Sequence, residues 1–189
     1  MTTLGKLGYT LSKPFTKRKR EIQMLMDHPI FRDISSWINI KIRALNIECP
    51  SKRAMAVAYL TIYFEEMQRF YRTICDDYDQ YTICSHNLYG SLHSIVSTIN
   101  ERATAVYVPK IFLDKMNIRF IRHIDILSET ITSSMSKNFY STSFEQVSSI
   151  LDMSLLFLHM EVDAIEVTIN SMNGELEKVL CGTIYDVKN

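Results

Sequence analysis

The chain has 189 residues, of which 47% are hydrophobic and 22% are charged, and its 21 Lys and Arg balance its 21 Asp and Glu. This composition predicts one globular domain that can bury a core without disulfides or a metal, and it excludes a disordered or fibrous chain. No segment has the length and hydrophobicity of a transmembrane helix, and no signal peptide is recognisable, so we expect no membrane partner and a cytoplasmic location, meaning the host cytoplasm or the virion if the protein is viral.

The charges are distributed unevenly along the chain. Residues 1–53 carry 11 Lys and Arg against 4 Asp and Glu, whereas residues 123–189 carry 3 against 10. Such an imbalance concerns partners or self-association rather than the fold.

The N-terminal segment is predicted to be a basic arm covering residues 1–20. Its first 16 residues lack apolar periodicity, and five cations then fall within eight positions: Lys13, Lys17, Arg18, Lys19 and Arg20. Such a cluster can be a solvated tail, can contact nucleic-acid phosphates, or can bind an acidic protein surface. We therefore name these five residues as the candidate partner-binding or phosphate-binding site.

The middle of the chain contains apolar residues at helical spacing. This periodicity predicts helices over 29–45, 52–75, 88–103 and 113–131, with residues 106–109 as a brief extended link. Glu65 and Arg69 stand four residues apart and are expected to form an exposed ion pair. Cys75, Cys84, His86 and His93 lie close in sequence, but their spacing matches no compact zinc site, so we expect no metal.

The segment from Phe144 to Met172 is expected to be the central helix of the protein. It contains neither proline nor glycine, and its apolar residues form two seams about 120° apart by helical geometry, so it should be covered from two sides. Ser143 and Gln146 have the spacing of a capping box at the start of the helix. Asn173 and Gly174 are expected to end it through a left-handed turn.

Glu161 projects between the two apolar seams of this segment. A carboxylate in a core is costly unless it is paired, so we expect Glu161 to be a buried acid with a partner on a neighbouring helix. Arg119, Arg122 and His123 are the candidate partners. The alternative is a functional acid with a perturbed pKa, which would make the protein an enzyme centred on Glu161.

The predicted fold is all-α. We expect a compact bundle of five or six helices around the long C-terminal helix, with the basic arm at 1–20, the helical domain at 21–174, and a short extended tail at 175–189. The tail is expected to be extended because residues 181–187 have a β-like pattern.

The sequence contains no phosphate-binding loop, dinucleotide fingerprint or nucleophile elbow, so we expect neither an enzyme nor a cofactor. Our first hypothesis is a non-enzymatic interaction or assembly subunit that binds a protein partner or another copy of itself through its charged ends. The composition, low in glycine and rich in Ile, Ser, Asn and Tyr, suggests a viral or phage structural or accessory protein. The alternative hypothesis is a regulatory protein whose basic arm binds nucleic acid.

Overall fold

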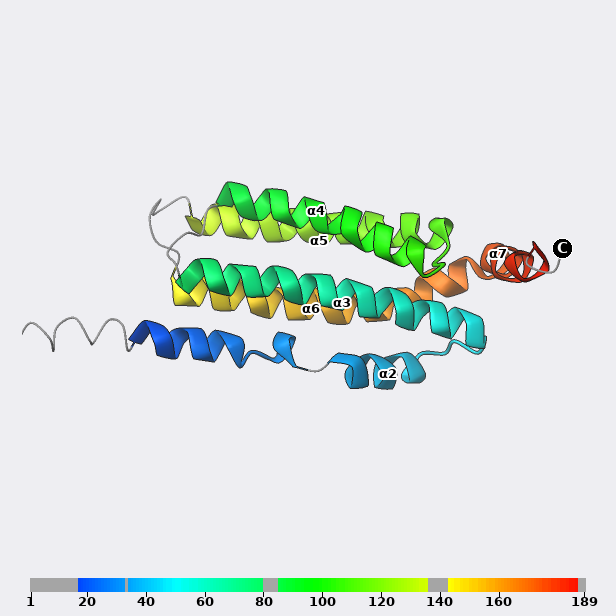
Figure 1. The fold of residues 1–189 in the computed structure, drawn as a ribbon, viewed down its shortest axis with the longest axis horizontal. Coiled ribbons are helices and arrows are strands. Elements are labelled where there is room, and N and C mark those ends of the chain that lie inside the picture. Colours follow the sequence, from blue (N-terminus) through cyan, green and yellow to red (C-terminus); the bar gives the residue numbers. More distant parts are fainter. Residues whose placement is uncertain (1–16, 33, 80–84, 136–142, 187–189) are drawn as a thin grey trace, which may run out of the picture.

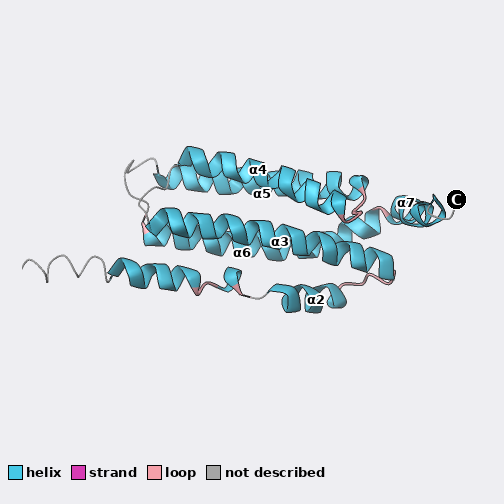
Figure 2. Ribbon diagram, in the orientation of Figure 1, coloured by secondary structure: helices cyan, strands magenta, loops and turns pink. Residues whose placement is uncertain are grey.

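The structure is a computed structural model that describes residues 17–32, 34–79, 85–135 and 143–186. Within these ranges every regular element is a helix and no strand occurs (Figure 2). The prediction of an all-α protein is therefore confirmed. Residues 17–26 are helical, and the elements that follow are η1 Pro29–Phe31, α2 Ile34–Ala44, α3 Pro50–Asp79, α4 Ser85–Ala105, α5 Lys110–Met135, α6 Phe144–Ser171 and α7 Asn173–Asp186.

The helices of the bundle run roughly parallel to the long axis of the molecule and are arranged in layers (Figure 1). α4 and α5 form one layer, α3 and α6 form the middle layer, and the segment from residue 17 to α2 runs along the other side of the middle layer. Contacts join α3 to α4, α4 to α5, α5 to α6, and α6 back to α3. α3 also contacts α2, and α6 also contacts η1. Both helices are therefore central, whereas the sequence predicts a central position for α6 alone.

The start of α6 follows directly from its sequence. The Ser143 side chain accepts a hydrogen bond from the backbone N–H of Gln146, and the Gln146 side chain accepts one from the backbone N–H of Ser143. This reciprocal capping box satisfies two N–H groups that the first turn leaves open. The first predicted seam is buried, including Val147, Leu158 and Ile165. The second is buried only in part, because Ile150 and Phe157 lie in the core while Met160 is 42% exposed.

The end of α6 differs from the prediction. The helix ends at Ser171, but α7 begins at Asn173, and Gly174 does not adopt the left-handed conformation that we expected to stop the chain. The predicted extended tail at 175–189 is also wrong in its described part, because α7 is helical through Asp186. Leu176 is fully buried in the core and Leu180 packs against it, so packing on the bundle stabilises the first half of α7 as a helix.

Other predicted boundaries also differ in the structure. The single helix predicted over 29–45 is divided into η1 and α2. Residues 17–20, which we placed in the arm, are helical, while residues 1–16 lie outside the described ranges. α3 begins at Pro50 rather than near residue 52, because proline suits the first turn of a helix, where its missing N–H would have no partner.

The link between α4 and α5 is a helix-terminating turn, not the extended link predicted for residues 106–109. The N–H of Val108 donates to the carbonyl of Ala103, and the N–H of Tyr107 donates to the carbonyl of Thr104. These two bonds define a Schellman motif, in which the residue after the helix adopts a left-handed conformation. Tyr107 occupies that position with φ of 62°.

Candidate functional site

Of the described residues of the predicted basic site, Lys17, Lys19 and Arg20 are exposed and Arg18 is half-buried. Lys17 is exposed and lies 3.5 Å from Glu21, one turn along the same helix. The guanidinium of Arg18 lies over the ring of Tyr78, 3.4 Å from its centroid, in a cation–π contact with the end of α3. Arg18 therefore holds this helix to the bundle, whereas Lys19 and Arg20 are exposed. Lys13 lies outside the described residues.

The basic N-terminal part of the chain is linked to the acidic C-terminal part within the same molecule. The His28 Nε2 atom lies 3.1 Å from a carboxylate oxygen of Asp152 on α6, and the Lys52 ammonium lies 3.0 Å from Glu177 on α7. The Lys52 side chain is almost completely buried, although Glu177 is largely exposed. The Lys52–Glu177 pair thus satisfies part of the charge asymmetry within the chain.

Glu161 lies in the core with 0% of its surface exposed. Its Oε1 atom accepts a hydrogen bond of 3.2 Å from the Tyr59 hydroxyl on α3, and its Oε2 atom lies 3.7 Å from Nδ1 of His123 on α5. His123 is therefore the nearest of the three predicted partners. Arg119 acts on Glu161 through its charge, and Arg122 is exposed.

The surroundings of Glu161 change its protonation. Burial raises the pKa of Glu161 to about 7, and this effect outweighs the Tyr59 hydrogen bond and the charge of Arg119, which both lower that pKa. Burial also lowers the pKa of His123, and Arg119 adds to this lowering. The pKa values of Tyr59 and Tyr63 are raised, first by burial and then by the nearby Glu161 carboxyl. These groups form a buried acid–base cluster.

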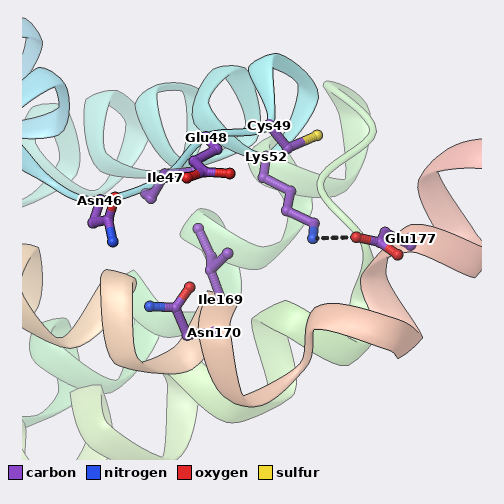
Figure 3. A pocket seen from close by; sticks show the side chains of 8 residues that line it. All are labelled: Asn46, Ile47, Glu48, Cys49, Lys52, Ile169, Asn170 and Glu177. Carbon is purple, nitrogen blue, oxygen red and sulfur yellow. Dashed lines mark hydrogen bonds and ion pairs between the residues drawn. The ribbon is translucent and has the colours of Figure 1, made fainter.

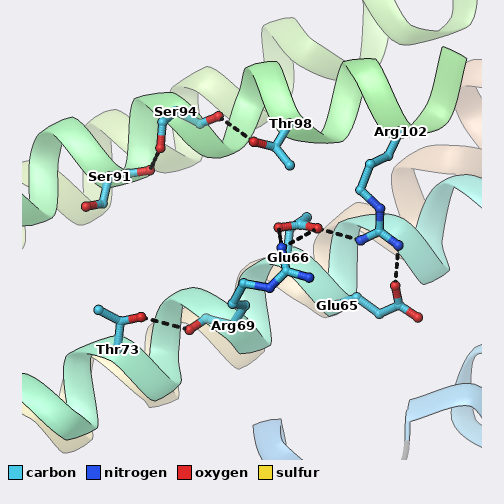
Figure 4. Close-up of polar contacts among 8 residues, drawn as sticks. All are labelled: Glu65, Glu66, Arg69, Thr73, Ser91, Ser94, Thr98 and Arg102. Atoms are coloured by element: carbon cyan, nitrogen blue, oxygen red, sulfur yellow. Dashed lines mark hydrogen bonds and ion pairs between the residues drawn. The ribbon is translucent and has the colours of Figure 1, made fainter. Parts of the chain in front are cut away.

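A second buried glutamate, which the sequence did not reveal, lies between α3 and α4. Glu66 accepts hydrogen bonds from the guanidinium groups of Arg69 and Arg102, and Arg102 also binds Glu65 at 2.6 Å (Figure 4). The predicted pair between Glu65 and Arg69 is therefore replaced by a network that crosses to α4. Charge-assisted bonds to two guanidinium groups satisfy the Glu66 carboxylate, so this network fixes the packing of α3 on α4.

A pocket of roughly 260 Å³ lies where the link between α2 and α3 meets the end of α6 and the start of α7. Figure 3 shows Lys52 reaching from α3 to Glu177 on α7 along this pocket. The complete lining is Asn46, Ile47, Glu48, Cys49, Lys52, Ile169, Asn170 and Glu177. Glu161 is not among these residues, so the pocket gives no access to the buried acid.

Cys49 stands immediately before the first turn of α3 and is partly exposed in this pocket. Its pKa is lowered mainly by the backbone N–H of Lys52, and the N–H of Ser51 and the Lys52 charge act in the same direction. Cys75 differs, because it is buried and its pKa is raised to about 12, mainly by that burial. Cys49 is thus the more nucleophilic of these two thiols at neutral pH.

No group of three or more His, Cys, Asp and Glu side chains among the described residues could hold a metal ion. No described helix combines the length and the apolar character needed to cross a bilayer. Comparisons of the chain with protein-family models, with curated proteins and with solved structures found no match.

The pocket was missed at the sequence level for a physical reason. Its lining comes from residues 46–52, 169–170 and 177, which are brought together only by the packing of α6 and α7 against the start of α3. Glu66 was missed because no apolar pattern distinguishes it from the exposed Glu65 beside it. Glu161 could be found because it interrupts two long apolar seams.

Proposed function

We propose that this chain is a non-enzymatic interaction or assembly subunit, and that the outward side of α5 and α6 is its contact surface. The observation that carries this proposal is a row of large aliphatic side chains that face solvent on α6. These are Leu156, Met160 and Val167, with 57%, 42% and 66% of their surface exposed. At spacings of four and seven residues they share one side of the helix.

The helix α5, which packs directly against α6, also has exposed aliphatic side chains. His123 of α5 stacks on Phe157 of α6, with ring centroids 4.5 Å apart and planes 7° apart, so the two helices pack closely. Ile118 and Ile126 of α5 are also exposed. We call the five residues Ile118, Ile126, Leu156, Met160 and Val167 the aliphatic face. Exposed aliphatic side chains gathered on adjacent helices are typical of protein contact sites.

The charges around the aliphatic face favour a second copy of the chain as the partner. α6 contains no Lys or Arg, and Asp163 is exposed close to the row. The exposed charged side chains of α5 are Lys110, Lys115 and Arg122 together with Asp114, Asp125 and Glu129. A two-fold pair of chains can lay α5 of one copy over α6 of the other, which places the basic side chains of one helix opposite the acidic side chains of its partner.

The composition that suggested a viral or phage structural or accessory protein supports the same class of function. Assembly subunits need a rigid scaffold and a contact surface rather than a catalytic centre. The buried Glu161 fits this role as a structural group, since the Tyr59 hydroxyl and the His123 imidazole surround its carboxyl group within the core.

The test is the molar mass of the protein measured by light scattering after size-exclusion chromatography. The wild type should elute with a mass that is a multiple of 22.0 kDa, and Val167→Asp should elute as a monomer because it places a charge in the contact surface. Ile40→Asp is the matched control, since Ile40 on α2 is also 66% exposed but lies away from the aliphatic face. If Val167→Asp and Ile40→Asp both retain the wild-type mass, the aliphatic face is not the contact surface.

A nucleic-acid-binding function is the second candidate, and the exposure of Lys17, Lys19 and Arg20 on one short helix favours it. Contacts of this kind release counterions, so binding should weaken steeply between about 50 and about 200 mM salt. Lys19→Ala with Arg20→Ala should reduce both the affinity and its dependence on salt, as measured by fluorescence anisotropy with a labelled oligonucleotide. Absence of binding by the wild type at the lowest salt would remove this candidate.

A further inference from the structure

Glu161 on α6 and His123 on α5 face each other inside the bundle. Glu161 is completely buried and His123 is 6% exposed. The carboxyl Oε2 and the imidazole Nδ1 lie 3.7 Å apart, and neither atom has a hydrogen-bond partner among the described residues. Two polar atoms without partners in a core are costly, so their proximity points to a shared proton rather than to chance packing.

The groups around this pair come from each helix that packs against it. From α3, the Tyr59 hydroxyl donates to Oε1, and Tyr63 lies close enough for its pKa to respond to the carboxyl group. From α5, the charge of Arg119 acts on both Glu161 and His123 without forming an ion pair with the carboxyl group in the described structure. On α6 itself, the Phe157 ring covers one face of the imidazole.

We infer that Glu161 and His123 hold one proton between them in the folded bundle, and that loss of this proton above neutral pH weakens the packing of α5 on α6. With the proton present, the pair has no net charge, and the two facing atoms, 3.7 Å apart, need to approach by only about half an ångström to join in one hydrogen bond. Without it, a buried carboxylate keeps only the Tyr59 hydroxyl and the distant charge of Arg119. A buried charge with so little compensation destabilises the folded state.

The direction of the pH effect follows from the pKa values of the two groups. Burial raises the pKa of Glu161 from 4.5 to about 7, so the folded chain binds more protons than the unfolded chain between these values. The resulting stabilisation is complete below pH 4.5 and is lost as the pH rises through about 7. His123 acts in the opposite sense just below 6.5, because its pKa is lowered and its stabilising contribution is lost as the pH falls.

The experiment compares the folding equilibrium constants of the wild type and of Glu161→Gln by urea unfolding. Glutamine has the shape of the protonated acid but does not titrate. The ratio of the wild-type constant to that of Glu161→Gln should therefore fall about tenfold between pH 6 and pH 8. Glu66→Gln is the matched control, since Glu66 is a buried glutamate that contacts two guanidinium groups instead of an imidazole. The ratio of the wild-type folding constant to that of Glu66→Gln should not fall between pH 6 and pH 8.

A second measurement does not depend on the folding of any variant. The side-chain carbonyl resonance of Glu161, followed by NMR in the wild-type protein, should titrate with a midpoint near 7. A midpoint near the ordinary 4.5, or equal pH dependence for the wild type and Glu161→Gln, would overturn the inference. Neither result depends on whether the aliphatic face mediates assembly, so the two proposals fail separately.

Discussion

At the scale of single residues, Tyr107 occupies a position that normally belongs to glycine. It lies two residues after the end of α4, at the left-handed position of a Schellman motif, with φ of 62° and 86% of its surface exposed. A side chain in the left-handed conformation costs roughly 1–2 kcal/mol. The Tyr107 side chain recovers little of this through burial, so the turn is held by the packing of the helices on both sides.

Tyr107→Gly should therefore stabilise the protein. The gain should be about 0.5–1 kcal/mol, because relief of the left-handed strain exceeds the extra entropy that glycine gives to the unfolded chain. Tyr107→Ala is the control, since alanine also loses the exposed ring but retains the Cβ atom that causes the strain. Urea unfolding measures both variants, and equal stability of Tyr107→Gly and Tyr107→Ala would contradict this account of the turn.

At the scale of elements, α6 divides into sides with different roles. Its two seams face α3 and α5, where Leu158 is 3% exposed, while the outward row contains Leu156, which is 57% exposed. The two leucines stand two residues apart on the same helix and have the same chemistry. Substituting each leucine in turn therefore distinguishes a side chain that stabilises the bundle from one that lies on the contact surface.

Leu158→Ala should cost about 2–5 kcal/mol of the free energy of unfolding, because it leaves a cavity between packed helices. Leu156→Ala should change this free energy by no more than about 0.5 kcal/mol. Both are measured by denaturant unfolding at a protein concentration low enough to exclude association. Similar losses for the two variants would show that α6 is not oriented as described.

How far the sequence predicts each element depends on whether local or distant contacts decide it. The helix at 144–171 is predictable because a capping box, an uninterrupted helical segment and two apolar seams all agree. α7 is not, because the helix begins with Leu176 and Leu180 packed against the bundle, a distant contact that the β-like pattern further along the chain does not reveal. For the sites, the interruption of two seams identifies Glu161, but nothing local could place Tyr59 and His123 beside it or join Lys52 to Glu177.

At the scale of the whole molecule, the layered helices leave two kinds of surface for recognition. The charged ends account for partner binding less well than the sequence suggests, because Arg18, His28 and Lys52 already contact groups of the same chain. Exposed ion pairs also contribute little binding energy when solvent screens them. The aliphatic face has no such internal partner among the described residues, and burying it would release water from five large side chains.

The most direct test of the central claim is sedimentation equilibrium of the wild-type protein over a wide range of concentrations. If the outward side of α5 and α6 joins two copies, the apparent mass should rise from 22.0 kDa toward twice that value as the concentration increases, at moderate as well as low salt. A mass that stays at 22.0 kDa at every concentration would contradict self-assembly through this face.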